Sequence, residues 1–73
     1  MLGEKEAVDL AKREATQQGW AWVEPARAML HRRWRGNGGT WEIYSNANGR
    51  GAIARFVIDA ETGAVLDKGY IPR

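Results

Sequence analysis

HRRWRGNGGTWEIY, at residues 31–44, holds three arginines, two tryptophans and a glycine-rich turn within fourteen positions. Asn37 followed by Gly38 is a strong hairpin signal, because a type I′ turn needs a positive φ angle at both central residues. Bulky and polar residues alternate on either side of it, as they do along a half-buried strand. The stretch therefore predicts a β-hairpin. This hairpin either binds a charged partner through its surface or turns its tryptophans toward the protein interior.

The two-residue period sorts the hairpin side chains onto two faces of a sheet. We expect strands at residues 26–35 and 40–45. The predicted inward positions are Ala28, Leu30, Arg32, Trp34, Trp41, Ile43 and Ser45. The predicted outward positions are Arg27, Met29, His31, Arg33, Arg35, Thr40, Glu42 and Tyr44. Arg32 falls on the apolar side, where its stem can cover Trp34 while its head stays in water.

Before the hairpin, residues 4–18 have the spacing of an amphipathic helix, with alanines and Leu10 along one face. Gly19 is a natural end for this helix, because glycine adopts a left-handed conformation without a Cβ clash. Trp20 follows it and can fold back toward Ala15, which gives this tryptophan a structural role.

After the hairpin, two more strands are expected, at residues 52–59 and 64–71. In the first of them, alternation points Ala52, Ala54, Phe56 and Ile58 inward and Ile53, Arg55 and Val57 outward. Asp59 can accept hydrogen bonds from nearby backbone N–H groups, and Gly63 can take the left-handed position that closes the turn. Short connections favour pairing of strands that are neighbours in sequence.

The sequence thus predicts a single α+β domain over residues 1–73, with one N-terminal helix packed on a four-stranded antiparallel meander sheet. The chain has no cysteine, which excludes disulfides and thiolate metal sites. His31 is its only histidine, too few for a zinc site of the usual kind. Four tryptophans are many for a small core, so we expect at least one to be partly exposed.

Charge is unevenly distributed along the chain. Residues 25–55 carry six arginines and one acidic residue, whereas the segments on either side are mildly acidic. Such asymmetry permits binding to nucleic acid or to an acidic protein. We find no leader-like apolar run and no stretch that could span a membrane, so we expect a cytoplasmic protein without membrane contact. A chain trimmed of a leader would look the same.

FVIDAETGAVL, at residues 56–66, resembles the end of the PepSY domain, which shows an apolar strand, an acidic residue, a threonine-glycine turn and a second apolar strand. An alanine-rich helix leads into that pattern, as EAVDLAKREA does here. The outline also resembles small immunity proteins of bacterial polymorphic-toxin systems, with a tryptophan-initiated strand at Trp41 and the turn from Ile58 to Gly63. The shared motifs cover residues 40–66. Neither family brings catalytic residues.

No catalytic constellation accompanies these patterns, so we expect a protein that is not an enzyme and has no cofactor and no metal. Arginine and tyrosine mixed with apolar residues are typical of interface cores. The residues that we expect to bind a partner are Arg27, Met29, His31, Arg33, Tyr44 and Arg55. The expected partner is another protein, as for an immunity or inhibitor-type module, or a second copy of the chain. The alternative is a nucleic-acid-binding module that uses arginines and tryptophans on the sheet.

Overall fold

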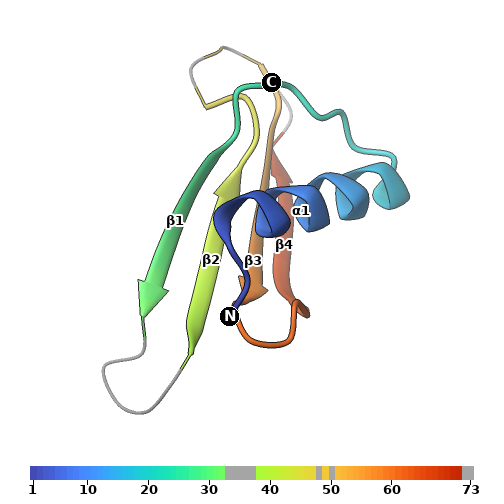
Figure 1. The fold of residues 1–73 in the computed structure, drawn as a ribbon. Coiled ribbons are helices and arrows are strands. Elements are labelled where there is room, and N and C mark those ends of the chain that lie inside the picture. Colours follow the sequence, from blue (N-terminus) through green and yellow to red (C-terminus); the bar gives the residue numbers. More distant parts are fainter. Residues whose placement is uncertain (33–37, 48, 50, 72–73) are drawn as a thin grey trace.

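The computed structural model describes residues 1–32, 38–47, 49 and 51–71 of the chain. Its elements are α1 (Glu4–Gln18), β1 (Arg27–Arg32), β2 (Gly39–Tyr44), β3 (Ile53–Asp59) and β4 (Val65–Ile71). The strands form one antiparallel sheet in the order β1-β2-β3-β4, and α1 crosses one of its faces (Figure 1). The predicted fold, a helix packed on a four-stranded meander, is confirmed.

Helix α1 ends where the sequence predicts. Gly19 has a φ angle of 75°, in the left-handed region. Its N–H donates to the Thr16 carbonyl at 3.1 Å, and the Trp20 N–H donates to the Ala15 carbonyl at 2.8 Å. These two bonds form a Schellman motif, which satisfies carbonyls at the helix end. The chain therefore turns sharply, and the Trp20 ring stacks on Tyr70 of β4 at a centroid distance of 5.5 Å.

The core lies between α1 and the face of the sheet that α1 crosses. Its buried members are Ala7, Ala11, Ala15, Trp41, Ile43, Ala54, Phe56, Ile58 and Ala60. The helix contributes only alanines to this set, so its backbone can lie close to the strands. Phe56 is fully buried and packs against the Trp20 and Trp22 rings, at 5.9 Å and 6.3 Å. The inward positions predicted for Trp41, Ile43, Ala54, Phe56 and Ile58 are confirmed. Ala52, also predicted inward, is half-buried and precedes β3.

Strand register confirms the two faces. Ala28 pairs with Ile43 and Leu30 with Trp41 on the covered face, whereas Met29 pairs with Glu42 on the opposite face. The observed ends of β2 differ by one residue from the predicted ends. The strand runs from Gly39 to Tyr44, whereas the prediction was residues 40–45. Alternation nevertheless continues past the strand. Ser45 is buried, and its hydroxyl accepts a hydrogen bond from the Ala54 N–H at 2.9 Å.

Strand β4 contains a bulge that the sequence pattern did not predict. Val57 pairs with Asp67, but the next residue, Ile58, pairs with Val65, so Leu66 is an extra residue on β4. The bulge sets which way the rest of β4 faces. It places Asp67 on the face away from the helix, while Lys68 forms an ion pair of 2.8 Å with Glu14 of α1.

Residues 33–37 lie outside the described residues. This gap includes half of the predicted turn, residues 36 and 37 of 36–39. It also includes the part of the first predicted strand that follows Arg32. Three side chains with predicted orientations also lie there: Arg33, Trp34 and Arg35. The turn after β3 is described. There the Asp59 carboxylate accepts bonds from the N–H groups of Glu61 and Thr62, at 2.8 Å and 3.2 Å, as predicted.

Candidate docking face

The sheet face away from α1 is the candidate functional surface, and we call it the open face. Two-residue alternation places these described residues on it: Arg27, Met29, His31, Thr40, Glu42, Tyr44, Ile53, Arg55, Val57 and Asp67. Within the described part of the chain the one helix, α1, lies on the other face, and no helix or strand covers this one (Figure 1). It joins side chains from all four strands.

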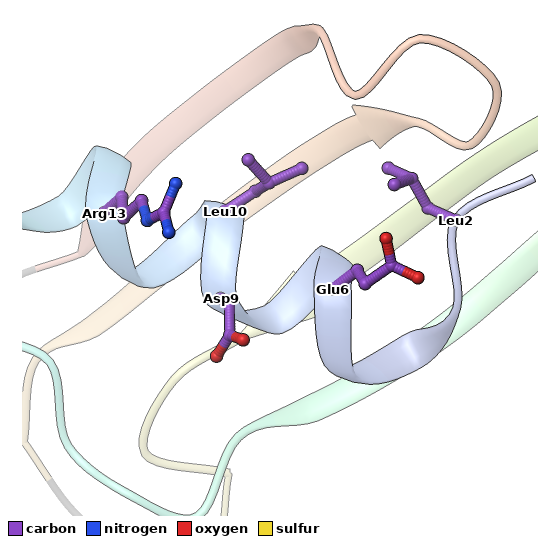
Figure 2. Close-up of a pocket in the computed structure, with 5 residues that line it drawn as sticks. All are labelled: Leu2, Glu6, Asp9, Leu10 and Arg13. Carbon is purple, nitrogen blue, oxygen red and sulfur yellow. The ribbon is translucent and has the colours of Figure 1, made fainter.

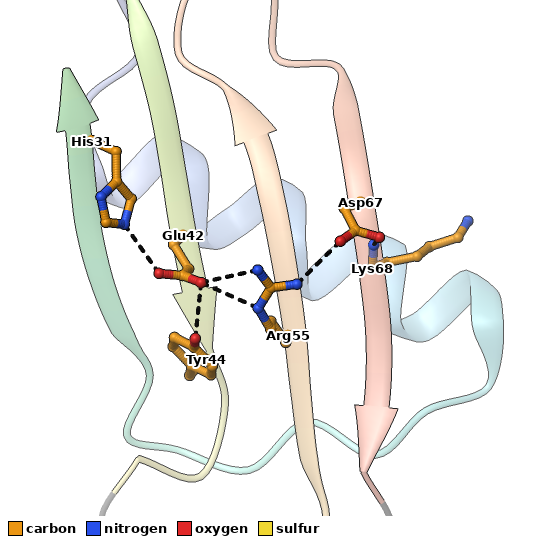
Figure 3. A network of polar contacts seen from close by, with 6 residues as sticks. All are labelled: His31, Glu42, Tyr44, Arg55, Asp67 and Lys68. Atoms are coloured by element: carbon orange, nitrogen blue, oxygen red, sulfur yellow. Dashed lines mark hydrogen bonds and ion pairs between the residues drawn. The ribbon is translucent and has the colours of Figure 1, made fainter. Parts of the chain in front are cut away.

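A polar network centred on Glu42 crosses the open face (Figure 3). One carboxylate oxygen of Glu42 lies 3.0 Å from Nε2 of His31 on β1. The other accepts hydrogen bonds from the Tyr44 hydroxyl at 2.9 Å and from Nε of Arg55 at 3.1 Å. Arg55 also reaches β4, where its Nη1 donates to Asp67 at 3.2 Å. The network therefore ties the four strands together.

The charges of this network stabilise one another. The Tyr44 hydroxyl, the His31 ring and the Arg55 guanidinium hold the pKa of Glu42 below its ordinary value, because each stabilises the carboxylate. Bonds to Tyr44, Asp67 and Glu42 raise the pKa of Arg55 above its ordinary value. Both groups are thus charged at neutral pH, and each charge is already partnered within the sheet.

Beside the network lies a shallow hollow of about 200 Å³, at the end of the face where β2 leads into the 45–52 loop. It is lined by Arg27, Met29, Tyr44, Ser45, Asn46, Ala47, Gly49 and Ile53. The lining combines an aromatic ring and two long apolar side chains with one guanidinium group. Such a combination fits a mixed apolar and polar side chain of a partner.

The structure brings together most of the side chains proposed from the sequence as partner-binding. Arg27, Met29 and Tyr44 line the hollow. His31, Tyr44 and Arg55 belong to the network, so Tyr44 joins the two features. The sixth proposed residue, Arg33, lies outside the described residues.

Sequence reasoning did not include Glu42 and Asp67 among the site residues. Glu42 was placed outward, but its central role depends on partners from β1 and β3 that alternation alone does not name. The available signal was that Glu42 is the one acidic residue among six arginines in residues 25–55. A single carboxylate in this basic segment is an obvious partner for its cations.

The described tryptophans do not contribute to the open face. Trp20 and Trp22 pack against Phe56 on the covered side. Trp41 is buried there too, and its indole N–H donates to the Leu2 carbonyl at 3.0 Å. Trp20 and Trp22 are half-buried, which agrees with the expectation that at least one tryptophan is partly exposed.

A second hollow, of about 250 Å³, lies along α1 near the start of the chain and is lined by Leu2, Glu6, Asp9, Leu10 and Arg13 (Figure 2). Its charged side chains carry both signs and are exposed. In the described residues no group of three or more histidine, aspartate or glutamate side chains could hold a metal ion. Among the same residues no helix has the length and apolar character needed to cross a membrane.

No family model matches the chain, and no curated protein or solved structure matches it either. Any assignment of function therefore rests on the geometry of the open face.

Proposed function

We propose that the protein is a non-catalytic protein-binding module, of an immunity or inhibitor type, that docks on its partner through the open face. One observation carries the proposal: the charges at the centre of this uncovered face are already paired with one another. Interface cores disfavour unpaired charge and favour tyrosine, methionine and arginine. A network that is already formed has fewer bare charges to desolvate on binding.

The hollow supplies the second part of such an interface. Arg27 is exposed, and among the described residues its side chain has no ion pair or hydrogen bond. Met29, Tyr44 and Ile53 are half-buried around it. A rigid tyrosine and an arginine next to apolar walls are the usual anchors of a binding surface.

Nucleic-acid binding, the alternative, draws less support from the open face. That function requires free cations beside aromatic rings on which bases can stack. Here Arg27 is unpaired among the described residues, but Arg55 is engaged by Glu42 and Asp67. The described tryptophans lie on the other side. Among the described residues the open face offers one aromatic ring, Tyr44, and its hydroxyl is bonded to Glu42.

The test is partner capture with matched variants. Immobilised wild-type protein is compared with Met29→Lys and Tyr44→Ala, both on the open face, and with Leu66→Lys as control. Leu66 is 56% exposed at the β4 bulge and does not line the hollow. We expect both face variants to lose the captured protein while the control retains it, with circular dichroism showing that all three fold.

Unchanged capture by both face variants would reject the open face as the docking surface. A parallel titration with single-stranded oligonucleotides addresses the alternative. Binding of the oligonucleotide that weakens steeply with salt, together with no protein capture, would favour the nucleic-acid function.

A further inference from the structure

Strand β1 is an edge of the sheet. It pairs with β2 on one side, and within the described residues no strand pairs with its other side (Figure 1). An edge strand leaves alternate N–H and C=O groups unpaired, and these can receive the backbone of another extended chain.

The two edges of this sheet differ in how well they resist such pairing. At the other edge, β4 has the bulge at Leu66. A bulge is one of the usual devices that prevent strand addition, because it interrupts the regular spacing of the free backbone groups. The β1–β2 register, in contrast, runs without a shift from Arg27 opposite Tyr44 to Arg32 opposite Gly39. The free edge of β1 is therefore regular enough to accept a strand.

Charge identifies the kind of strand that this edge accepts. Arg27, His31 and Arg32 are all exposed on β1. Within the described residues the side chains of Arg27 and Arg32 form no ion pair or hydrogen bond, whereas Arg55 and Lys68 elsewhere on the sheet are both paired. The edge strand thus presents two unpaired guanidinium groups beside its free backbone groups.

A second copy of the chain is a poor occupant, because antiparallel pairing of two β1 strands would bring their basic side chains close together. An acidic segment suits the edge. Arg27 projects on the open face and Arg32 on the helix side, since they are five residues apart on a strand. Their partners on an added strand must also be five residues apart. Between them, Met29 and Leu30 present one apolar side chain to each face.

We infer that the free edge of β1 binds an extended acidic segment of another protein, which joins the sheet as a fifth strand. The segment carries acidic residues at its first and sixth positions and apolar residues at its third and fourth. This inference names the partner segment and so rests on the proposed protein-binding function. It uses the edge of the sheet in addition to the open face.

The probe is a blocked hexapeptide with glutamates at positions one and six, valines at three and four, and threonines at two and five. Added to the wild-type protein, it should shift the backbone amide signals of β1 and slow their hydrogen exchange. The double variant Arg27→Glu, Arg32→Glu should bind it about tenfold more weakly, since two exposed ion pairs are lost. The matched control is Lys12→Glu, Arg13→Glu on exposed positions of α1, which should bind normally.

Two further peptides separate strand addition from simple charge attraction. A peptide N-methylated at alternate residues keeps its charges but cannot pair, so it should not protect the β1 amides. A peptide with both glutamates moved to adjacent positions should bind more weakly than the original. Equal binding of all three peptides would overturn the inference.

The outcomes for the edge and for the open face can be told apart. Tyr44→Ala, which changes only the open face, should leave peptide binding intact. A peptide that binds β1 while the open-face variants still capture a partner would reject the proposed face and keep the edge. Absence of peptide binding together with partner capture that depends on Tyr44 would reject the edge alone.

Discussion

The two faces of this sheet are stabilised by different kinds of interaction, although they are built from alternate residues of the same strands. In β3, Phe56 points toward α1 and is fully buried among aromatic rings, whereas its neighbour Arg55 points away and is bonded to two carboxylates. The covered face gains its stability from apolar burial, which does not depend on direction. The open face depends on direction, because each polar group needs its partner at the correct distance.

The two faces also differ in how much each contributes to folding stability. A buried aromatic side chain contributes several times more stability than an exposed or partly exposed ion pair. A substitution on the open face should therefore cost less folding stability than one on the covered face. A surface that is ordered but contributes the smaller part of the stability is compatible with the proposed binding function.

The largest effect is expected on the covered face. Phe56→Ala should remove about 3–5 kcal/mol from the free energy of unfolding. That is comparable to the whole stability of a domain this small, so the variant should be largely unfolded at 25 °C. The comparison variant is Val57→Ala, one residue along β3 on the open face, which should remain folded and lose about 1 kcal/mol. Urea denaturation followed by tryptophan fluorescence measures both.

If Phe56→Ala and Val57→Ala lose the same free energy of unfolding, the open face is as important to folding as the covered face. Phe56→Leu provides a milder change at the same position if the alanine variant does not fold. It should retain a measurable transition, because most of the buried volume remains.

The sequence predicts the covered face well because its signal is local. Two-residue alternation assigns Trp41, Ile43 and Phe56 to one side without knowledge of which strand lies next to which. The end of α1 is equally local, since the conformation of Gly19 and the hydrogen bonds around it involve residues within one turn. Both features follow from a few consecutive residues.

The open-face network could not be predicted in the same way, because its bonds join distant parts of the chain. Glu42 meets Arg55 across thirteen positions, and Arg55 meets Asp67 across twelve. Alternation gives the face of a side chain but not the strand register, which sets the neighbours of Glu42. The position of Asp67 depends in addition on the bulge at Leu66, for which the sequence carried no recognised signal.

A smaller effect is expected from Glu42→Gln, which removes the central charge of the network but keeps its size. At pH 7 the variant should lose about 1–2 kcal/mol of stability, because hydrogen bonds to a charged acceptor are replaced by neutral ones. The folded-state pKa of Glu42 lies below 4.5, so its contribution is present above that pH and is lost as the pH falls through the folded pKa. The two proteins should therefore converge in stability in acid.

Denaturant unfolding at several pH values between about 7 and 3 checks this pH dependence. Asp9→Asn is the control, because Asp9 is an exposed carboxylate on α1 outside the network. The free energy of unfolding of this variant should depend on pH in the same way as that of the wild type. A constant difference between wild type and Glu42→Gln down to the lowest pH would mean that the charge of Glu42 does not stabilise the fold.

The smallest effect is expected from Tyr44→Phe, which keeps the ring in the hollow and removes only the hydroxyl bond of 2.9 Å to Glu42. The loss should be about 0.5–1 kcal/mol, the usual range for one hydrogen bond that water can partly replace. Because this hydroxyl is the largest cause of the lowered pKa of Glu42, the pKa should rise in the variant. An NMR titration of the Glu42 carboxyl group measures that change. An unaltered pKa would mean that Tyr44 contributes to the open face through its ring alone. Partner capture would then be sensitive to Tyr44→Ala and indifferent to Tyr44→Phe.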